Sequence, residues 1–478
     1  MSPARPPSAL AATAWAYAQS WTARGLGLLI FLLLARLLNP QDFGAFAIAA
    51  MVLALSETVL EQGLSSALVQ REDLQPEHLN AAFWGALAIG ALLAVLAALC
   101  AQPLAQMFDA PAIATLMLGL APVFLLMAAA VVPAAKLRRD LNYQWLARRA
   151  LLANLLAGAA AVATAARGHG AWAFVINQWV YQAVSLALLW GSEPWRPSRF
   201  FSALRFRELF GFSSRVSAAK LLDYLEARAL EFWVAHGIGL GALGQYSFAS
   251  RNAQAGQQML AGPIWDSALG ILSRLQGEQN ALKESLLRLL RLAGWIAFPP
   301  LVFVIAAAPL AVPLAFGEKW RASIWCLQLL LLLSLMRTPL FLLGVAIQAR
   351  GNARISLHLT ALRVGCALSM MVLLPLHDIG VVAGALLCAQ GFGAIFVVAA
   401  ARQQLHVGFL ELGAALTAPL LFCAVGGGAV AAVLRFGHWQ GWPLLLAVGA
   451  LYSLLWGVLA LPFALRLRGA PMVAVSKT

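Results

Sequence analysis

Apolar stretches of roughly 20 residues follow one another along most of the chain, separated by short polar turns. Each stretch can cross the ~30 Å hydrocarbon core of a bilayer as an α-helix, and none shows the period-two alternation of a strand. The pattern therefore predicts an all-α integral membrane protein with about 14 transmembrane helices. The predicted spans are 14–37, 44–68, 81–101, 113–134, 150–167, 170–190, 213–235, 243–271, 290–313, 323–347, 354–375, 379–401, 411–434 and 443–465.

The composition agrees with this class, because 62% of the 478 residues are hydrophobic and only 11% are charged. The five cysteines lie singly in apolar segments and the seven histidines are scattered, so we expect neither disulfides nor a metal site, and no cofactor. The first 15 residues lack a short apolar core followed by a cleavage site, so we expect no removable signal peptide.

The net charge of +14 reflects membrane topology. The basic residues gather in every second loop, whereas the opposite loops hold few, namely Arg167, Lys319, Arg321 and Arg435. The positive-inside rule then places both termini in the cytoplasm of a multi-pass inner-membrane protein. We expect no nucleic-acid partner.

Two halves of the chain are related. ARLLNPQDFGAFAIA (35–49) resembles AHGIGLGALGQYSFA (235–249), 200 positions later, with Gly44 matching Gly244. We predict an N-lobe of six helices (1–190), a cytoplasmic amphipathic linker (191–212) and a C-lobe of six helices (213–402), followed by two additional helices and a cytoplasmic tail (403–478). Six spans per lobe make the lobes parallel repeats.

The stretch 213–235 is unusually polar for a span, and an alternative is that 213–271 forms part of a cytoplasmic domain. The repeat favours two crossings, because it aligns this stretch with the first two spans. Each mid-helix charge costs about 3 kcal/mol to insert, so the helix must face water or partner charges. Its polar residues share one helical stripe, and two oppositely charged pairs stand at i,i+3, Lys220 with Asp223 and Arg228 with Glu231.

Other predicted spans also carry charges, and together they indicate a polar cleft. Guanidinium groups bind phosphate oxygens in bidentate fashion, so we expect the cations to contact an anionic substrate. The acids are either coupling-ion sites or salt-bridge partners, and both readings stay open. The candidate substrate-binding cations are Arg24, Lys220, Arg251, Arg228, Arg337 and Arg363, and the candidate acids are Glu57, Glu61, Asp223 and Asp266.

Several motifs resemble one known family. RLLNPQDFGAFAIA followed by EQGLSSALVQREDLQPEHLNAAFWGAL is similar to the opening of Wzx-type polysaccharide flippases, and GQYSFASR and FGEKWRASIWCLQLL match further along. The family belongs to the multidrug/oligosaccharidyl-lipid/polysaccharide (MOP) exporter superfamily. Where the family has an acid before the outer turn of the seventh span, this chain has Leu230 and offers Glu231 one position later.

The resemblance implies a flippase, not an enzyme. Its substrate would be an undecaprenyl-pyrophosphate-linked oligosaccharide, moved across the inner membrane by alternating access for O-antigen, capsule or exopolysaccharide biosynthesis. Implied partners are membrane lipids, a proton or sodium as coupling ion, and the polysaccharide polymerase and chain-length machinery. The first alternative is a cation-coupled multidrug exporter of the same superfamily. A more remote one is a glycan polymerase or ligase, which the short outer loops and the lack of a D-x-D element disfavour.

Overall fold

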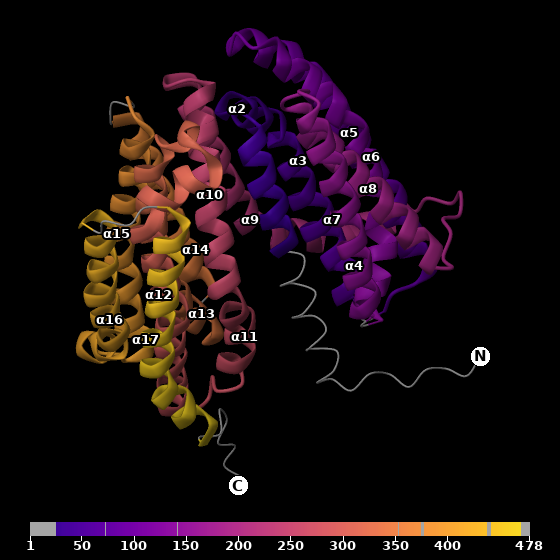
Figure 1. The fold of residues 1–478 in the computed structure, drawn as a ribbon. Helices are drawn as coiled ribbons and strands as arrows, with labels where there is room; N and C mark the ends of the chain where they lie inside the picture. Colours follow the sequence, from indigo (N-terminus) through magenta and orange to yellow (C-terminus); the bar gives the residue numbers. More distant parts are fainter. Residues whose placement is uncertain are drawn as a thin grey trace. The chain divides into compact units, whose positions relative to one another are not determined.

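The computed structural model describes residues 25–71, 73–140, 142–351, 353–373, 377–436 and 441–469. Within these ranges the side chains of some helical residues lie outside the description, and the longest run of them is 210–223. The described residues form helices joined by short turns (Figure 1). The chain divides into two compact units, Met1–Ser247 and Phe248–Thr478.

The first unit begins, in its described part, with the apolar helix Gly25–Leu37. The helices that follow are α2 (Pro40–Ala49), α3 (Met51–Ser56), the π-helix η1 (Glu57–Ser65), α4 (Ser66–Gln70), α5 (Pro76–Met107), α6 (Pro111–Arg139), α7 (Tyr143–Ala166), α8 (Trp172–Ser192) and α9 (Ala203–Gly237). The first two turns of α10 (Leu240–Leu260) also belong to this unit.

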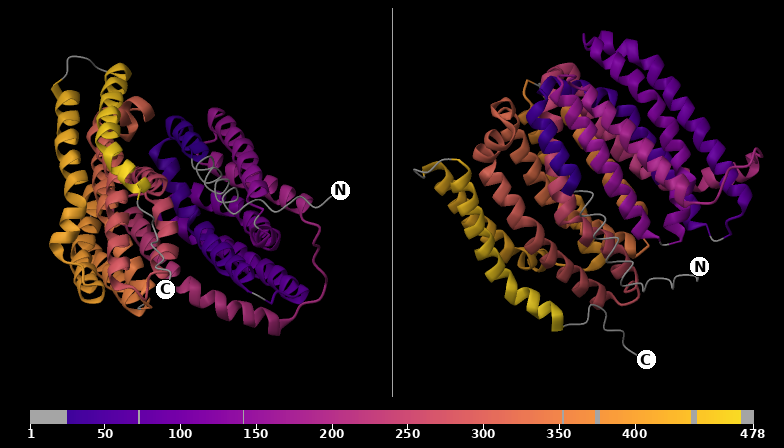
Figure 2. Two further views of the ribbon diagram at one scale, coloured as in Figure 1. Left: turned by 90° about the horizontal axis from the view of Figure 1, so that it is seen from below. Right: turned by 45° about the vertical axis from the view of Figure 1, so that its right-hand side comes forward.

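The second unit contains the rest of α10 and the C-terminal helices. These are α11 (Gly262–Ser273), α12 (Gln279–Phe316), the 3-10 helix η2 (Glu318–Trp320), α13 (Ser323–Ala349), α14 (Ala353–Leu373), α15 (Ile379–Leu405), α16 (Phe409–Phe436) and α17 (Trp442–Gly469). Within the unit, α16 and α17 pack against α12 at its margin (Figure 2).

The described helices cover the predicted spans, which confirms the predicted fold class, but the predicted span 243–271 is divided between α10 and α11. In the described part of the chain, nine helices are long and apolar enough to cross a membrane, and the bent pair Pro40–Ala49 with Met51–Gln70 makes a tenth. Two shorter apolar helices, Gly25–Leu37 and His358–Leu373, fall on predicted spans as well. Large apolar side chains point outward, for example Leu99 (70% exposed) and Leu410 (89%), as expected of surfaces that face lipid.

The predicted repeat is visible in a close contact between the first turns of α2 and α10. A Cβ added at Gly44 would lie 1.9 Å from the carbonyl oxygen of Leu240, and one added at Gly244 would lie 1.7 Å from that of Pro40. These two contacts exchange when each residue is replaced by its counterpart 200 positions away, which is the signature of a two-fold relation. Only glycine allows the backbones to approach so closely.

The boundary between the compact units falls inside α10, between Ser247 and Phe248. The predicted linker 191–212 lies earlier and is split in two. Residues 193–202 have no regular structure, and the remainder forms the first turns of α9, where the Ser202 hydroxyl accepts from the Arg205 N–H. The division of the chain into lobes at this linker stays a prediction.

Candidate functional site

Four predicted site residues lie where no side chain is described. Arg24 precedes the described residues. Lys220 and Asp223 belong to α9 and Asp266 belongs to α11, but their side chains are outside the described set.

The predicted pair on α9 is present. Arg228 donates to Glu231, one turn later, and its guanidinium lies 5.8 Å from the centre of the Tyr224 ring. The Tyr224 hydroxyl in turn donates to the carbonyl oxygen of Met51 at 2.8 Å, which ties α9 to the start of α3. The i,i+3 spacing thus predicted the pairing of Arg228 with Glu231.

The two acids of the second predicted span lie on the π-helix η1. The Arg138 guanidinium at the end of α6 lies 3.9 Å from the Glu61 carboxylate and donates to the Ser65 hydroxyl at 3.1 Å. Glu57 and Glu61 are both exposed. A π-helix is rare and is often found at functional sites, because its extra residue per turn realigns the side chains.

In the second unit, two predicted arginines meet the same turn of α15. Arg337 of α13 donates from Nε to the buried amide of Gln390 at 3.4 Å. Arg363 of α14 lies beside Gly393, where an added Cβ would be 3.5 Å from the arginine Cβ. Arg251 lies exposed on α10. Arg337 and Arg363 therefore approach α15 at positions only one turn apart.

Sequence reasoning missed a polar face on α8, because it carries no charge. The face consists of Asn177, Gln178, Tyr181, Gln182 and Ser185, which occupy less than half of the helix circumference. Their i,i+4 spacing is a signal that the sequence did contain. Tyr181 lies within electrostatic range of both η1 acids and of Arg138 and Arg149.

Arg149 stands opposite this face, in the second turn of α7. It donates from Nη1 to the Ser185 hydroxyl at 2.9 Å, and its buried Nε has no hydrogen-bond partner. Among the described residues, no carboxylate forms a salt bridge with it. Arg149 lies one position before the predicted span 150–167, but α7 begins at Tyr143 and carries it into the helix.

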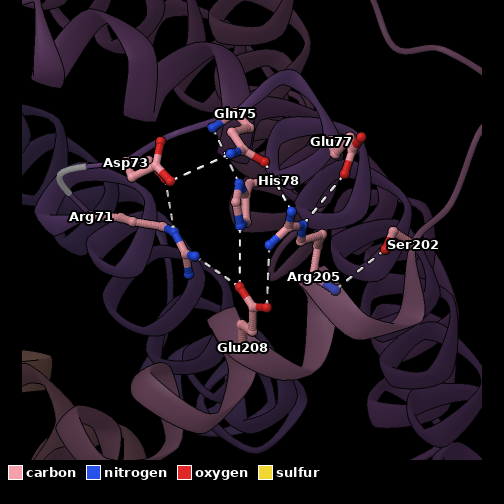
Figure 3. Close-up of polar contacts among 8 residues, drawn as sticks. All are labelled: Arg71, Asp73, Gln75, Glu77, His78, Ser202, Arg205 and Glu208. Atoms are coloured by element: carbon pink, nitrogen blue, oxygen red, sulfur yellow. Dashed lines mark hydrogen bonds and ion pairs between the residues drawn. The ribbon is translucent and has the colours of Figure 1, made fainter.

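A second missed cluster joins the start of α9 to the turn before α5 (Figure 3). The Glu208 carboxylate accepts from Arg71 at 2.8 Å, from His78 at 3.3 Å and from Arg205 at 3.4 Å. His78 is fully buried, and its Nδ1 accepts from the Gln75 N–H. The geometry thus assigns the proton to Nε2, which donates to Glu208.

This Glu208 junction is fully paired. Arg205 also contacts the side chains of Gln75 at 3.0 Å and Glu77 at 3.4 Å. The hydrogen bonds from His78 and then from Arg71 hold the pKa of Glu208 below its usual value. The residues come from segments more than 100 positions apart, which is why spacing along the sequence could not show the cluster.

The fold is that of membrane transporters with two related halves. It matches the solved lipid II flippase MurJ in an inward closed conformation with a TM-score of 0.74 and 12% identity, over 93% of this chain and 98% of that one. It also matches an inward-facing multidrug-resistance MATE family transporter of the MOP superfamily, with a TM-score of 0.62 and 18% identity, over 80% and 94%. At these identities the likeness concerns the fold.

The chain belongs to the family described as polysaccharide biosynthesis protein, whose model matches residues 33–325. The lipopolysaccharide biosynthesis protein WzxC of Escherichia coli is 25% identical over 70% of this chain and 68% of its own length. The succinoglycan biosynthesis transport protein ExoT of Rhizobium meliloti is 25% identical over 68% and 66%. The resemblance drawn from the sequence motifs is confirmed, as is the prediction that the chain is not an enzyme.

Proposed function

We propose that this protein is a flippase that moves undecaprenyl-pyrophosphate-linked oligosaccharide repeat units across the bacterial inner membrane by alternating access. The units would serve O-antigen, capsule or exopolysaccharide synthesis. The observation that carries the proposal is a set of charged and amide side chains, on η1, α8 and α9, in helices of a polysaccharide-biosynthesis protein with a transporter fold. Such groups are costly in lipid, so they serve a polar substrate path.

The predicted cations remain our proposed substrate contacts, with Arg24, Lys220 and Arg251 as the central phosphate ligands. The orientation that follows from the charge pattern, with both termini in the cytoplasm, belongs to the same proposal. Energy would come from a proton or sodium gradient or from the membrane potential. The acids Glu57 and Glu61 are the described candidates for a coupling-ion site.

Accumulation of lipid-linked repeat units that face the cytoplasm tests the proposed function. A deletion strain should accumulate them, and the wild-type gene should remove them. Arg24→Ala and Arg251→Ala should restore export poorly, whereas Arg321→Ala should restore it fully, because Arg321 forms an exposed pair with Glu318. Normal export by the first two variants would disprove the site, and an unchanged lipid pool together with new drug sensitivity would indicate a drug exporter instead.

The reciprocal contact between the two turns allows a test of alternating access. A Cβ at Gly241 would lie 3.9 Å from Cγ of Gln41, its counterpart in the repeat, so Gln41→Cys with Gly241→Cys can form a disulfide. In a background without the native cysteines, oxidation should stop export and reduction should restore it. Export that continues at full rate in the cross-linked protein would exclude any cycle in which these turns separate.

A further inference from the structure

The orientation of α8 is fixed by two tryptophans on one side. Trp179 donates from Nε1 to the carbonyl oxygen of Gly119 at 2.8 Å, and Trp190 donates to that of Ala129 at 3.2 Å. Both acceptors belong to α6, so this side of α8 packs against α6. The polar face that is centred on Ser185 points elsewhere, toward Arg149 of α7.

The amides on this face have no partner among the described residues. Gln182 is only 7% exposed, yet its side chain forms no hydrogen bond there. Asn177, Gln178 and the Tyr181 hydroxyl likewise form none in the described part of the chain. These polar groups are not paired within the described fold, so they bond to water or to a ligand that donates and accepts.

The charges around the face select the kind of ligand. The guanidinium groups of Arg138 and Arg149 and the carboxylates of Glu57 and Glu61 all act on Tyr181, and Arg138 lies 3.9 Å from Glu61. A pyrophosphate is bound by an excess of cations, whereas the charges of these two arginines and two glutamates sum to zero. Amides, a phenol and carboxylates instead match the hydroxyl groups of a sugar, each of which both donates and accepts.

We propose that the polar face of α8, together with Arg149, binds the saccharide part of the substrate. The inference rests on the proposed flippase function and assigns the sugars to this face, apart from the pyrophosphate. Tyr181 would pack against a pyranose ring, while Gln178 and Gln182 bind its hydroxyls. The Nε of Arg149, which is buried without a partner, would donate to the same ligand.

The test compares two probes on the full-length protein in detergent. One probe is undecaprenyl pyrophosphate without sugar, and the other is the lipid-linked oligosaccharide extracted from cells that lack the gene. We expect the wild type to bind the second more tightly. Gln178→Leu with Gln182→Leu should weaken binding of the oligosaccharide-bearing lipid about tenfold, the effect of one or two hydrogen bonds. Binding of the bare lipid should stay unchanged.

The matched control is Asn154→Leu on α7, because this amide is already satisfied by the carbonyl oxygen of Ala150 at 2.8 Å. A second pair, Gln178→Ala with Gln182→Ala, and the melting temperature of each variant separate binding from folding. If the variants keep the wild-type preference, or lose stability while that preference remains, the saccharide site is wrong and the flippase function stands. If the wild type binds neither probe, the proposed function itself fails, and the saccharide site fails with it.

Discussion

At the Glu208 junction, one carboxylate accepts hydrogen bonds from Arg71, His78 and Arg205, and the surrounding polar groups bond to one another. On α8, by contrast, the amides of the polar face form no hydrogen bond to any described residue, and Ser185 accepts one from Arg149. Both regions belong to the first unit.

The difference separates two uses of polarity in a membrane protein. A fully paired cluster holds segments together, since each donor and acceptor would be costly without its partner. Polar groups of a span that the fold leaves unpaired add no stability to it, and we infer that they serve to bind a ligand. The junction is therefore expected to affect stability, and the face to affect transport.

The largest effect on the amount of folded protein is expected from Glu208→Ala. It leaves two guanidinium groups and the buried His78 without their common acceptor, so the amount of folded protein in the membrane should fall roughly several-fold. Immunoblots of membrane fractions and melting curves measure this. Glu284→Ala, which breaks an exposed i,i+4 pair with Arg288, should change neither. Equal amounts of both variants would disprove the structural role of the junction.

Arg149→Met tests the opposite region. It keeps the apolar stem but removes the charge that donates to Ser185, so export per molecule should fall by about tenfold, as expected for a charge-assisted hydrogen bond. The amount of protein should stay normal. Arg167→Met, at the exposed end of the same helix, is the control. A lower amount of protein with normal export per molecule would place Arg149 among the structural residues.

Acid should weaken the junction and leave the α8 face unaffected. The pKa of Glu208 is lowered in the folded protein, so its charged form adds stability above the usual value of 4.5, and this contribution disappears as the pH falls through the folded pKa. As the pH falls from about 5 to about 3, the wild type should lose stability relative to Glu208→Gln. The effect is small, because the carboxylate is partly exposed to solvent. Parallel pH profiles of melting temperature would contradict it.

Ser185→Ala should have the smallest effect. It removes a neutral acceptor and leaves Arg149 free to turn toward the ligand, so export should fall only about two- to threefold. Rates of polymer export, normalised to the amount of protein, provide the measurement. A loss as large as that of Arg149→Met would mean that the serine positions the guanidinium.

The apolar runs and the internal repeat made most of the fold predictable from the sequence. Apolar runs located the spans, and the match of Gly44 with Gly244 located the repeat, because only glycine permits that contact. The pair of Arg228 with Glu231 followed from its i,i+3 spacing.

What could not be predicted depends on tertiary structure. The Glu208 junction joins residues from distant segments, and no local period connects Arg71 with Glu208. The π-helix η1 inserts extra residues into its turns, which a regular 3.6-residue period cannot anticipate. The polar face of α8 follows an i,i+4 spacing in the sequence, but uncharged side chains within a span do not reveal whether the fold leaves them unpaired.

The central claim is that the Glu208 junction serves stability and the polar face of α8 serves transport. The most direct test measures polymer export by Gln182→Leu and by Glu208→Ala and divides each rate by the amount of that variant in the membrane. We predict that Gln182→Leu lowers export per molecule at an unchanged amount of protein. Glu208→Ala should lower the amount at an unchanged export per molecule. If Gln182→Leu lowers only the amount, or if Glu208→Ala lowers export per molecule, the division between a structural junction and a substrate-binding face is wrong.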